Sequence, residues 1–134
     1  MLVLLDTHVW IWFREGNPTI QKDAAWIERM ADAGNVLISP ISCWEVAQLC
    51  SKGRIALHLP CQRWVDSALK GAQLAPLSPA IAVEANYLPG EFHPDPADRI
   101  LVATARLTDA TLVTRDSRIL NYALAGYLDR KSVV

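Results

Sequence analysis

The segment Leu2-Val3-Leu4-Leu5-Asp6-Thr7, residues 2–7, decides the fold class. Its apolar residues run without interruption and end at an acid, which is typical of a short strand buried on both faces of a parallel sheet. Further along the chain, short apolar segments alternate with longer segments of helical spacing. This alternation predicts an α/β fold, with a parallel sheet and right-handed crossovers.

The same patterns place the other elements. Strands are predicted over residues 2–5, 36–38, 74–77 and 111–114. Helices are predicted over residues 8–14, 19–33, 43–52, 60–70, 79–87 and 96–107, with another that starts over residues 117–120. Residues 127–134 contain no clear final strand. The chain has no linker, repeat or shift in composition, so residues 1–134 are predicted to form one domain.

Composition excludes several classes of protein. The chain has 134 residues, of which 51% are hydrophobic and 20% are charged, as in a globular domain. The formal net charge of −1 lacks the basic excess of many nucleic-acid-binding proteins, but acids that hold a metal would offset basic residues elsewhere. The three cysteines do not have the spacing of a zinc site or a disulfide framework. No segment resembles a signal peptide or a membrane span, which predicts a soluble cytoplasmic protein.

Four acids lie at the junctions between predicted strands and helices: Asp6, Glu45, Asp98 and Asp116. In parallel sheets, ligands bind beyond the carboxyl ends of the strands. Gathering like charges there raises the free energy of ionising each one, and a hard divalent cation offsets this repulsion through oxygen ligands. If the four acids converge, the chain is a magnesium- or manganese-dependent enzyme that acts on phosphate esters.

Each acid also has a structural explanation. Asp6 and Asp116 are candidate N-caps. Ser42 and Glu45 fit a capping box. Asp98 lies in a first turn, where the helix dipole favours an acid, after a candidate cap at Asp95. Spacing alone therefore leaves the catalytic and the capping interpretations about equally weighted.

Other motifs add little. The chain contains neither a P-loop nor a dinucleotide-binding fingerprint nor a nucleophile elbow. His93 lies in a proline-containing loop and is a weak candidate metal ligand. The five tryptophans are candidates for base stacking, but large aromatic side chains more often fill a core or an interface.

Five segments in order resemble the PIN-domain ribonucleases, specifically the VapC-type toxins of bacterial toxin–antitoxin pairs. These segments are Leu4-Leu5-Asp6-Thr7-His8-Val9-Trp10, Ile41-Ser42-Cys43-Trp44-Glu45-Val46, Gly53-Arg54-Ile55, Phe92 to Ala105 (FHPDPADRILVATA) and Leu112-Val113-Thr114-Arg115-Asp116. Each alone is weak, but the ordered set covers nearly the whole chain. The resemblance implies a single-domain α/β/α sandwich on a small, four- to five-stranded parallel sheet.

The resemblance also implies the chemistry. The family's acidic quartet falls on Asp6, Glu45, Asp98 and Asp116, which would hold one or two Mg²⁺ or Mn²⁺ ions for the hydrolysis of RNA phosphodiester bonds. Supporting roles are predicted for Asp95, as an outer or water-mediated ligand, for Thr114, as a group that orients Asp116 or a water molecule, and more weakly for Ser117. Because each neighbours a quartet acid in sequence, Arg99 and Arg115 are candidates for phosphate contacts.

The implied partners are an RNA substrate, a cognate antitoxin protein and a second copy of the chain in a homodimer, with no membrane. Trp10 and Trp12 are candidates for the apolar groove that would receive the antitoxin. Two alternatives stay open: a non-catalytic PIN-like binding module, and another magnesium-dependent phosphohydrolase or a receiver-like domain. The receiver reading is weakened because Asp6 has no neighbouring acid and the late strand ends without a lysine.

Overall fold

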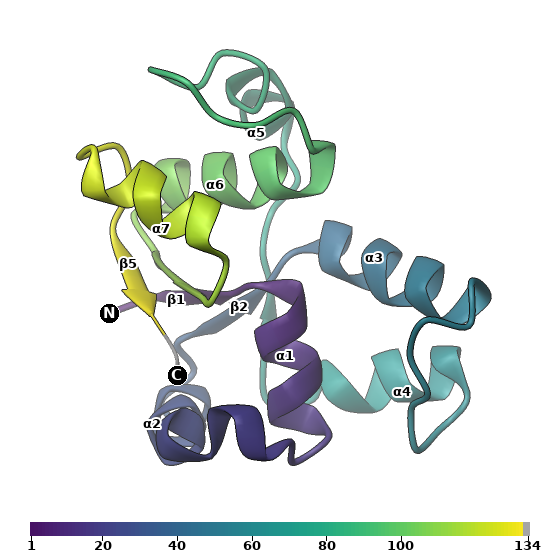
Figure 1. The fold of residues 1–134 in the computed structure, drawn as a ribbon. Coiled ribbons are helices and arrows are strands. Elements are labelled where there is room, and N and C mark those ends of the chain that lie inside the picture. Colours follow the sequence, from purple (N-terminus) through teal and green to yellow (C-terminus); the bar gives the residue numbers. More distant parts are fainter. Residues whose placement is uncertain (133–134) are drawn as a thin grey trace.

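The computed structural model describes residues 1–132 of the chain. Within these residues, five parallel strands form one sheet in the order β3-β2-β1-β4-β5 (Figure 1). The strands are β1 (Val3–Leu5), β2 (Val36–Ile38), β3 (Gln73–Leu74), β4 (Thr111–Thr114) and β5 (Arg130–Ser132). The predicted parallel α/β architecture is therefore confirmed.

Helices cover both faces of this sheet. They are α1 (Thr7–Arg14), η1 (Pro18–Ile20), α2 (Gln21–Asp32), α3 (Pro40–Ser51), α4 (Cys61–Ala68), α5 (Pro79–Glu84), α6 (Pro96–Thr108) and α7 (Ser117–Leu124). In Figure 1, α5, α6 and α7 lie on one side of the strands, and α1, α2 and α4 lie on the other. No helix in residues 1–132 is long and apolar enough to cross a membrane.

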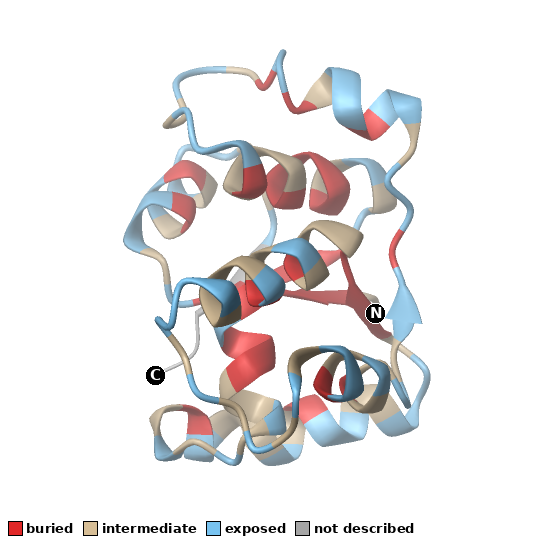
Figure 2. Cartoon of the chain, turned by 90° about the vertical axis from the view of Figure 1, so that its right-hand side faces the viewer, coloured by how far each residue is buried: buried red, intermediate tan, exposed pale blue. Residues whose placement is uncertain are grey.

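The strand β1 supplies side chains to two separate cores. Neighbouring residues of a strand point to opposite faces, so Val3 and Leu5 join one cluster while Leu4 joins the other. In the first cluster the buried rings of Trp10 and Trp64 pack edge to face, with centroids 4.9 Å apart. Figure 2 shows the central strands as buried and the outer helix surfaces as exposed. The apolar run is uninterrupted because β1 is buried on both faces of the sheet, as the sequence predicted.

The helix α3 begins earlier than the sequence predicted. Ser39 is its N-cap, and the Ser39 hydroxyl accepts a hydrogen bond of 3.1 Å from the Ile41 amide. Pro40 follows at the first helical position, where its fixed φ and missing N–H suit a helix start. The capping box predicted at Ser42 and Glu45 is therefore wrong, because both residues lie inside the helix.

Strand β3 also differs from its predicted range of 74–77. It pairs with β2 over Gln73 and Leu74, and the amide of Ala75 still donates to the carbonyl of Ile38 at 2.8 Å. Pro76 has no amide hydrogen to continue the ladder, so the strand stops there.

The C-terminal region contains more regular structure than its sequence suggested. Helix α7 extends to Leu124, and β5 adds a fifth strand beside β4, with Leu112 in register with Arg130. The expectation of no clear strand after residue 127 is wrong for residues 130–132. Residues 133 and 134 lie outside the described part of the chain.

The order of the strands brings the ends of β1 and β4 together. Leu5 is in register with Val113, and the Asp6 amide donates to the Val113 carbonyl at 2.9 Å. Asp6 directly follows β1, and Asp116 lies two residues beyond the end of β4. The two acids therefore arrive at one edge of the sheet from residues more than a hundred positions apart.

Candidate active site

A cavity of about 650 Å³ lies where the carboxyl ends of β1 and β4 meet. Five carboxylates, three arginines and a short aromatic and apolar wall surround it. The lining residues are Asp6, His8, Val9, Trp12, Glu45, Arg54, Asp95, Asp98, Arg115, Asp116 and Arg118. All four acids of the predicted quartet thus line a single cavity, although they belong to four different segments of the chain.

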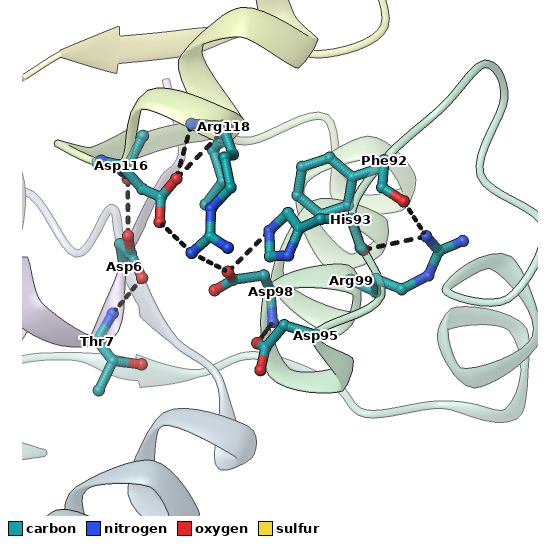
Figure 3. A network of polar contacts seen from close by, with 11 residues as sticks. Asp6, Thr7, Phe92, His93, Asp95, Asp98, Arg99, Asp116 and Arg118 are labelled. Carbon is teal, nitrogen blue, oxygen red and sulfur yellow. Dashed lines mark hydrogen bonds and ion pairs between the residues drawn. The ribbon is translucent and has the colours of Figure 1, made fainter.

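Asp6 is held by two hydrogen bonds on its two carboxylate oxygens. Its Oδ1 accepts from the Thr7 amide at 2.7 Å, which makes Asp6 the N-cap of α1. Its Oδ2 accepts from the Thr114 hydroxyl at 2.7 Å (the labelled part of this network is drawn in Figure 3). The buried Asp6 side chain therefore caps α1, as the sequence indicated, and also lines the cavity.

Glu45 lines the cavity from α3, and its carboxylate is held by the Thr7 hydroxyl, which also contacts the Ser42 hydroxyl. The Thr7 hydroxyl donates to Glu45 Oε1, and its oxygen lies 2.8 Å from the hydroxyl oxygen of Ser42. Thr7 and Ser42 are both buried. The sequence paired Ser42 with Glu45 only as a capping box and did not identify Thr7 as a partner of either, because the contacts of Thr7 depend on the packing of α1 against α3.

Replacing Thr7 with valine should lower the free energy of unfolding by about 1–3 kcal/mol, because Ser42 and Glu45 then lose a buried partner. Urea unfolding monitored by circular dichroism measures this change. Thr7→Ser keeps the hydroxyl and should recover most of the loss. If the serine variant is as unstable as the valine variant, the methyl group rather than the hydroxyl is responsible.

Asp98 lies in the first turn of α6, three residues after the N-cap residue Asp95. The Asp98 amide donates to Asp95 Oδ2 at 3.0 Å, so Asp95 is the N-cap that the sequence indicated. The Nε2 atom of His93 lies 3.0 Å from Asp98 Oδ2, although this buried nitrogen lacks hydrogen-bond geometry to any described group. His93 therefore faces the acid cluster from the loop before α6 (Figure 3).

Asp116 caps α7 and is tied to Thr114 and Arg118. Its Oδ1 accepts from the Arg118 amide at 2.8 Å, and its own amide donates to the Thr114 hydroxyl at 3.0 Å. Thr114 was predicted to orient Asp116 or a water molecule. Its hydroxyl instead donates to Asp6 and accepts from the Asp116 backbone, and so links the ends of β1 and β4.

Burial and mutual repulsion raise the pKa of most of these acids. Burial raises the pKa of Asp98 to about 7, and the charge of Asp6 is the strongest of the neighbouring carboxylates that add to the rise. Burial also raises the pKa of Asp6 and of Glu45. Burial acts in the same direction on Asp116, but hydrogen bonds from Arg118 outweigh it and lower that pKa. The cavity therefore carries negative charge that the described protein groups only partly neutralise.

The structure separates the two arginines that the sequence paired with quartet acids. Arg115 lines the cavity, with its guanidinium 5.9 Å from the centre of the Trp12 ring. Arg99 does not line the cavity. Its guanidinium donates to the carbonyl of Ala85 at 2.7 Å and to the carbonyl of Phe92 at 2.9 Å, the second of which is drawn in Figure 3. Arg99 therefore holds the loop before α6 and lies outside the acid cavity, and its phosphate contact stays a prediction.

Two further sequence predictions need correction or restriction. Trp10 is only 1% exposed and packs on Trp64, so it is a core residue and not part of a surface groove. Trp12 lines both the acid cavity and a smaller groove beside η1, which supports its groove assignment.

Ser117 is exposed at the start of α7 and does not line the cavity. Arg54 and Arg118 line it without having been assigned a role from sequence.

The side chains of the quartet suit a hard divalent cation, because all four offer carboxylate oxygens and three of the four acids have raised pKa values. The four carboxylates nevertheless do not converge on a common centre in the described residues. Among residues 1–132, no three His, Cys, Asp or Glu side chains are grouped closely enough to hold an ion as they stand. The chemistry of the site fits a metal, and the acids must draw together to hold it.

Three comparisons with known proteins bear on this geometry. A family model for the PIN domain matches residues 3–124. Ribonuclease VapC22 of Mycobacterium tuberculosis is 32% identical over 120 residues, which make up 90% of this chain and 91% of that protein. The crystal structure of VapBC2 from Rickettsia felis bound to a promoter DNA fragment has a chain with a TM-score of 0.74 and 17% identity over 100% of both chains. A toxin–antitoxin complex from Klebsiella pneumoniae gives a TM-score of 0.63 and 25% identity over 87% of this chain and 88% of the other.

Proposed function

The chain belongs to the PIN-domain family, and we propose that it is a metal-dependent endoribonuclease toxin inhibited by a cognate antitoxin. The observation that carries this proposal is that Asp6, Glu45, Asp98 and Asp116 line one cavity and three of them have raised pKa values. A relative that covers most of the chain is a ribonuclease, which directs the proposal to RNA rather than to other phosphate esters. We also propose that residues 1–134 form one PIN domain that acts in the cytoplasm.

The proposed ligands of Mg²⁺ or Mn²⁺ are the four acids, with Asp98 and Asp6 as the principal ones. When bound, such an ion lowers the pKa of a coordinated water molecule and neutralises charge on the phosphate and the leaving oxygen. Thr114 and the Thr7 amide fix both oxygens of Asp6, and Thr7 fixes Glu45. These hydrogen bonds keep two carboxylates oriented before substrate arrives, which limits the reorganisation that the reaction requires. Asp95 supports the site as the cap that holds the first turn of α6.

The proposed partners are the antitoxin and a second copy of the chain. The groove beside η1 has a volume of about 260 Å³ and is lined partly by Trp12, Phe13, Pro18 and Ile20. An apolar segment of an antitoxin in this groove would lie next to the acid cavity, because Trp12 belongs to both. The homodimer is part of the same proposal, and sedimentation of the purified protein measures it.

The proposal is tested by incubating the purified protein with structured RNA and either Mg²⁺ or Mn²⁺. We expect internal cleavage that yields discrete fragments on a denaturing gel. A parallel preparation of Asp98→Asn controls for contaminating nucleases, because it is purified in the same way. RNA binding without cleavage under every metal condition would instead support a non-catalytic binding module.

A further inference from the structure

Arg118 occupies the space between two acids of the quartet. Its Nη2 atom lies 3.3 Å from Asp116 Oδ2 and 4.0 Å from Asp98 Oδ2 (Figure 3). The two acids come from different helices, so this one guanidinium joins the first turn of α6 to the cap of α7. Its charge lies where the acids must draw together if they are to share a cation.

The contact of Arg118 with the acids is open to exchange. Its side chain is 60% exposed, and neither ion pair to a carboxylate is shorter than 3.3 Å. Exposed ion pairs of this kind contribute little to stability, so a divalent cation competes with them easily. The backbone of Arg118 is held more firmly, because its amide donates to Asp116 Oδ1 at 2.8 Å.

An RNA strand that approaches this cavity meets five carboxylates. Its phosphates need cationic side chains nearby, and the cavity offers Arg54, Arg115 and Arg118. Arg115 lies over the Trp12 ring, whereas Arg118 is the arginine ion-paired to the acids within residues 1–132. A guanidinium released from Asp98 and Asp116 keeps its anchored backbone at the rim of the same cavity.

We propose that Arg118 is a further functional residue of this site: it neutralises Asp98 and Asp116 in the metal-free protein, and it contacts a phosphate of the RNA once a divalent cation has displaced it from the acids. This inference rests on the proposed function. It assigns to Arg118 opposite effects on two ligands. Arg118 opposes metal binding and favours RNA binding, whereas a merely structural residue would support both.

The test is Arg118→Gln, measured in two experiments. Calorimetric titration with Mn²⁺ should give a dissociation constant about two- to fivefold lower than in the wild type, because the competing cation is gone. At saturating Mn²⁺, KM for RNA should rise about tenfold, with a smaller change in kcat, because a charge-assisted phosphate contact is lost. Arg118→Lys keeps the charge and should lie between the wild type and the glutamine variant in both measurements.

Arg115→Gln is the matched control for the metal titration. It removes a guanidinium from the same cavity that has no ion pair with a quartet acid among the described residues, so the Mn²⁺ dissociation constant should not change. If Arg118→Gln binds Mn²⁺ equally or more weakly, the counter-ion role is overturned. If its KM is unchanged, the phosphate contact is overturned. A wild-type protein that binds no Mn²⁺ would contradict the proposed metal-dependent function itself, which is a different result.

Discussion

Asp98→Asn is expected to lower RNA cleavage at least about a thousandfold and, in the metal-free protein, to stabilise the fold. Loss of a metal ligand removes several kcal/mol of transition-state stabilisation. The same substitution removes a charge that the fold resists, since burial and the neighbouring carboxylates raise the pKa of Asp98 to about 7. The gain should be on the order of 2 kcal/mol above pH ~7, after allowance for partial solvent screening. Cleavage assays and urea unfolding measure the two effects.

The sign of the stability effect depends on pH. Because its folded pKa is raised, Asp98 binds a proton more tightly in the folded than in the unfolded chain. Its contribution to stability is therefore full below its usual pKa of 3.8 and is lost as pH rises to about 7. The advantage of Asp98→Asn over the wild type should be small near pH ~4 and complete near pH ~8.

Asp109→Asn is the matched control for this substitution. Asp109 is exposed at the other end of α6, with a left-handed φ of 56° that asparagine also tolerates. Because Asp109 does not line the cavity, its substitution should leave cleavage unchanged and should not reproduce the stabilisation expected of Asp98→Asn. An Asp98→Asn protein that is folded and still cleaves RNA within about tenfold of the wild type would remove Asp98 from the proposed site.

The central strands were predictable because burial on both faces leaves a local signal. Residues 3–5 and 36–38 are uninterrupted apolar runs, and their observed ends agree with the prediction to within one residue. The two edge strands were shifted or missed. Residues 73–74 and 130–132 form strands through pairing with distant neighbours, and their sequences do not show a run of apolar residues. Edge strands have one partner fewer, so less of their structure is encoded locally.

The acids of the site were predictable for a similar reason. Asp6 and Asp116 are helix caps at strand ends, and Asp98 lies in a capped first turn, so each carries a short-range signal. The neighbours of Glu45 could not be identified in this way. Thr7 lies 38 residues away from Glu45 in sequence, and only the packing of α1 against α3 brings them together.

The arginines illustrate the limit of sequence proximity. Arg99 follows Asp98 directly, but successive helical residues are rotated by about 100°, so its side chain leaves the cavity and binds carbonyls instead. Arg118 is two residues from Asp116, and the cap geometry turns its guanidinium back toward that acid. Distance in sequence thus favoured Arg99, whereas helix geometry favours Arg118.

Chelation of divalent ions with EDTA should reduce cleavage to background, and added Mn²⁺ or Mg²⁺ should restore it with an affinity that rises with pH. Protons and metal ions compete for the same carboxylates. Since the pKa of Asp98 is about 7, a proton must leave it before a metal binds below that pH. The dissociation constant for Mn²⁺ should therefore fall roughly tenfold between about pH 6 and pH 8, and then level off. Calorimetry in two buffers of different ionisation enthalpy measures the proton released.

Two asparagine variants distinguish the residue that causes this pH dependence. Asp116→Asn should weaken Mn²⁺ binding but keep its pH dependence, because hydrogen bonds from Arg118 lower the pKa of Asp116 and leave it ionised throughout this range. Asp98→Asn should weaken binding and also flatten the pH dependence. If the dependence survives in Asp98→Asn, the competing proton belongs to Asp6 or Glu45, whose pKa values burial also raises. Cleavage that persists in EDTA would contradict the metal mechanism whichever acid titrates.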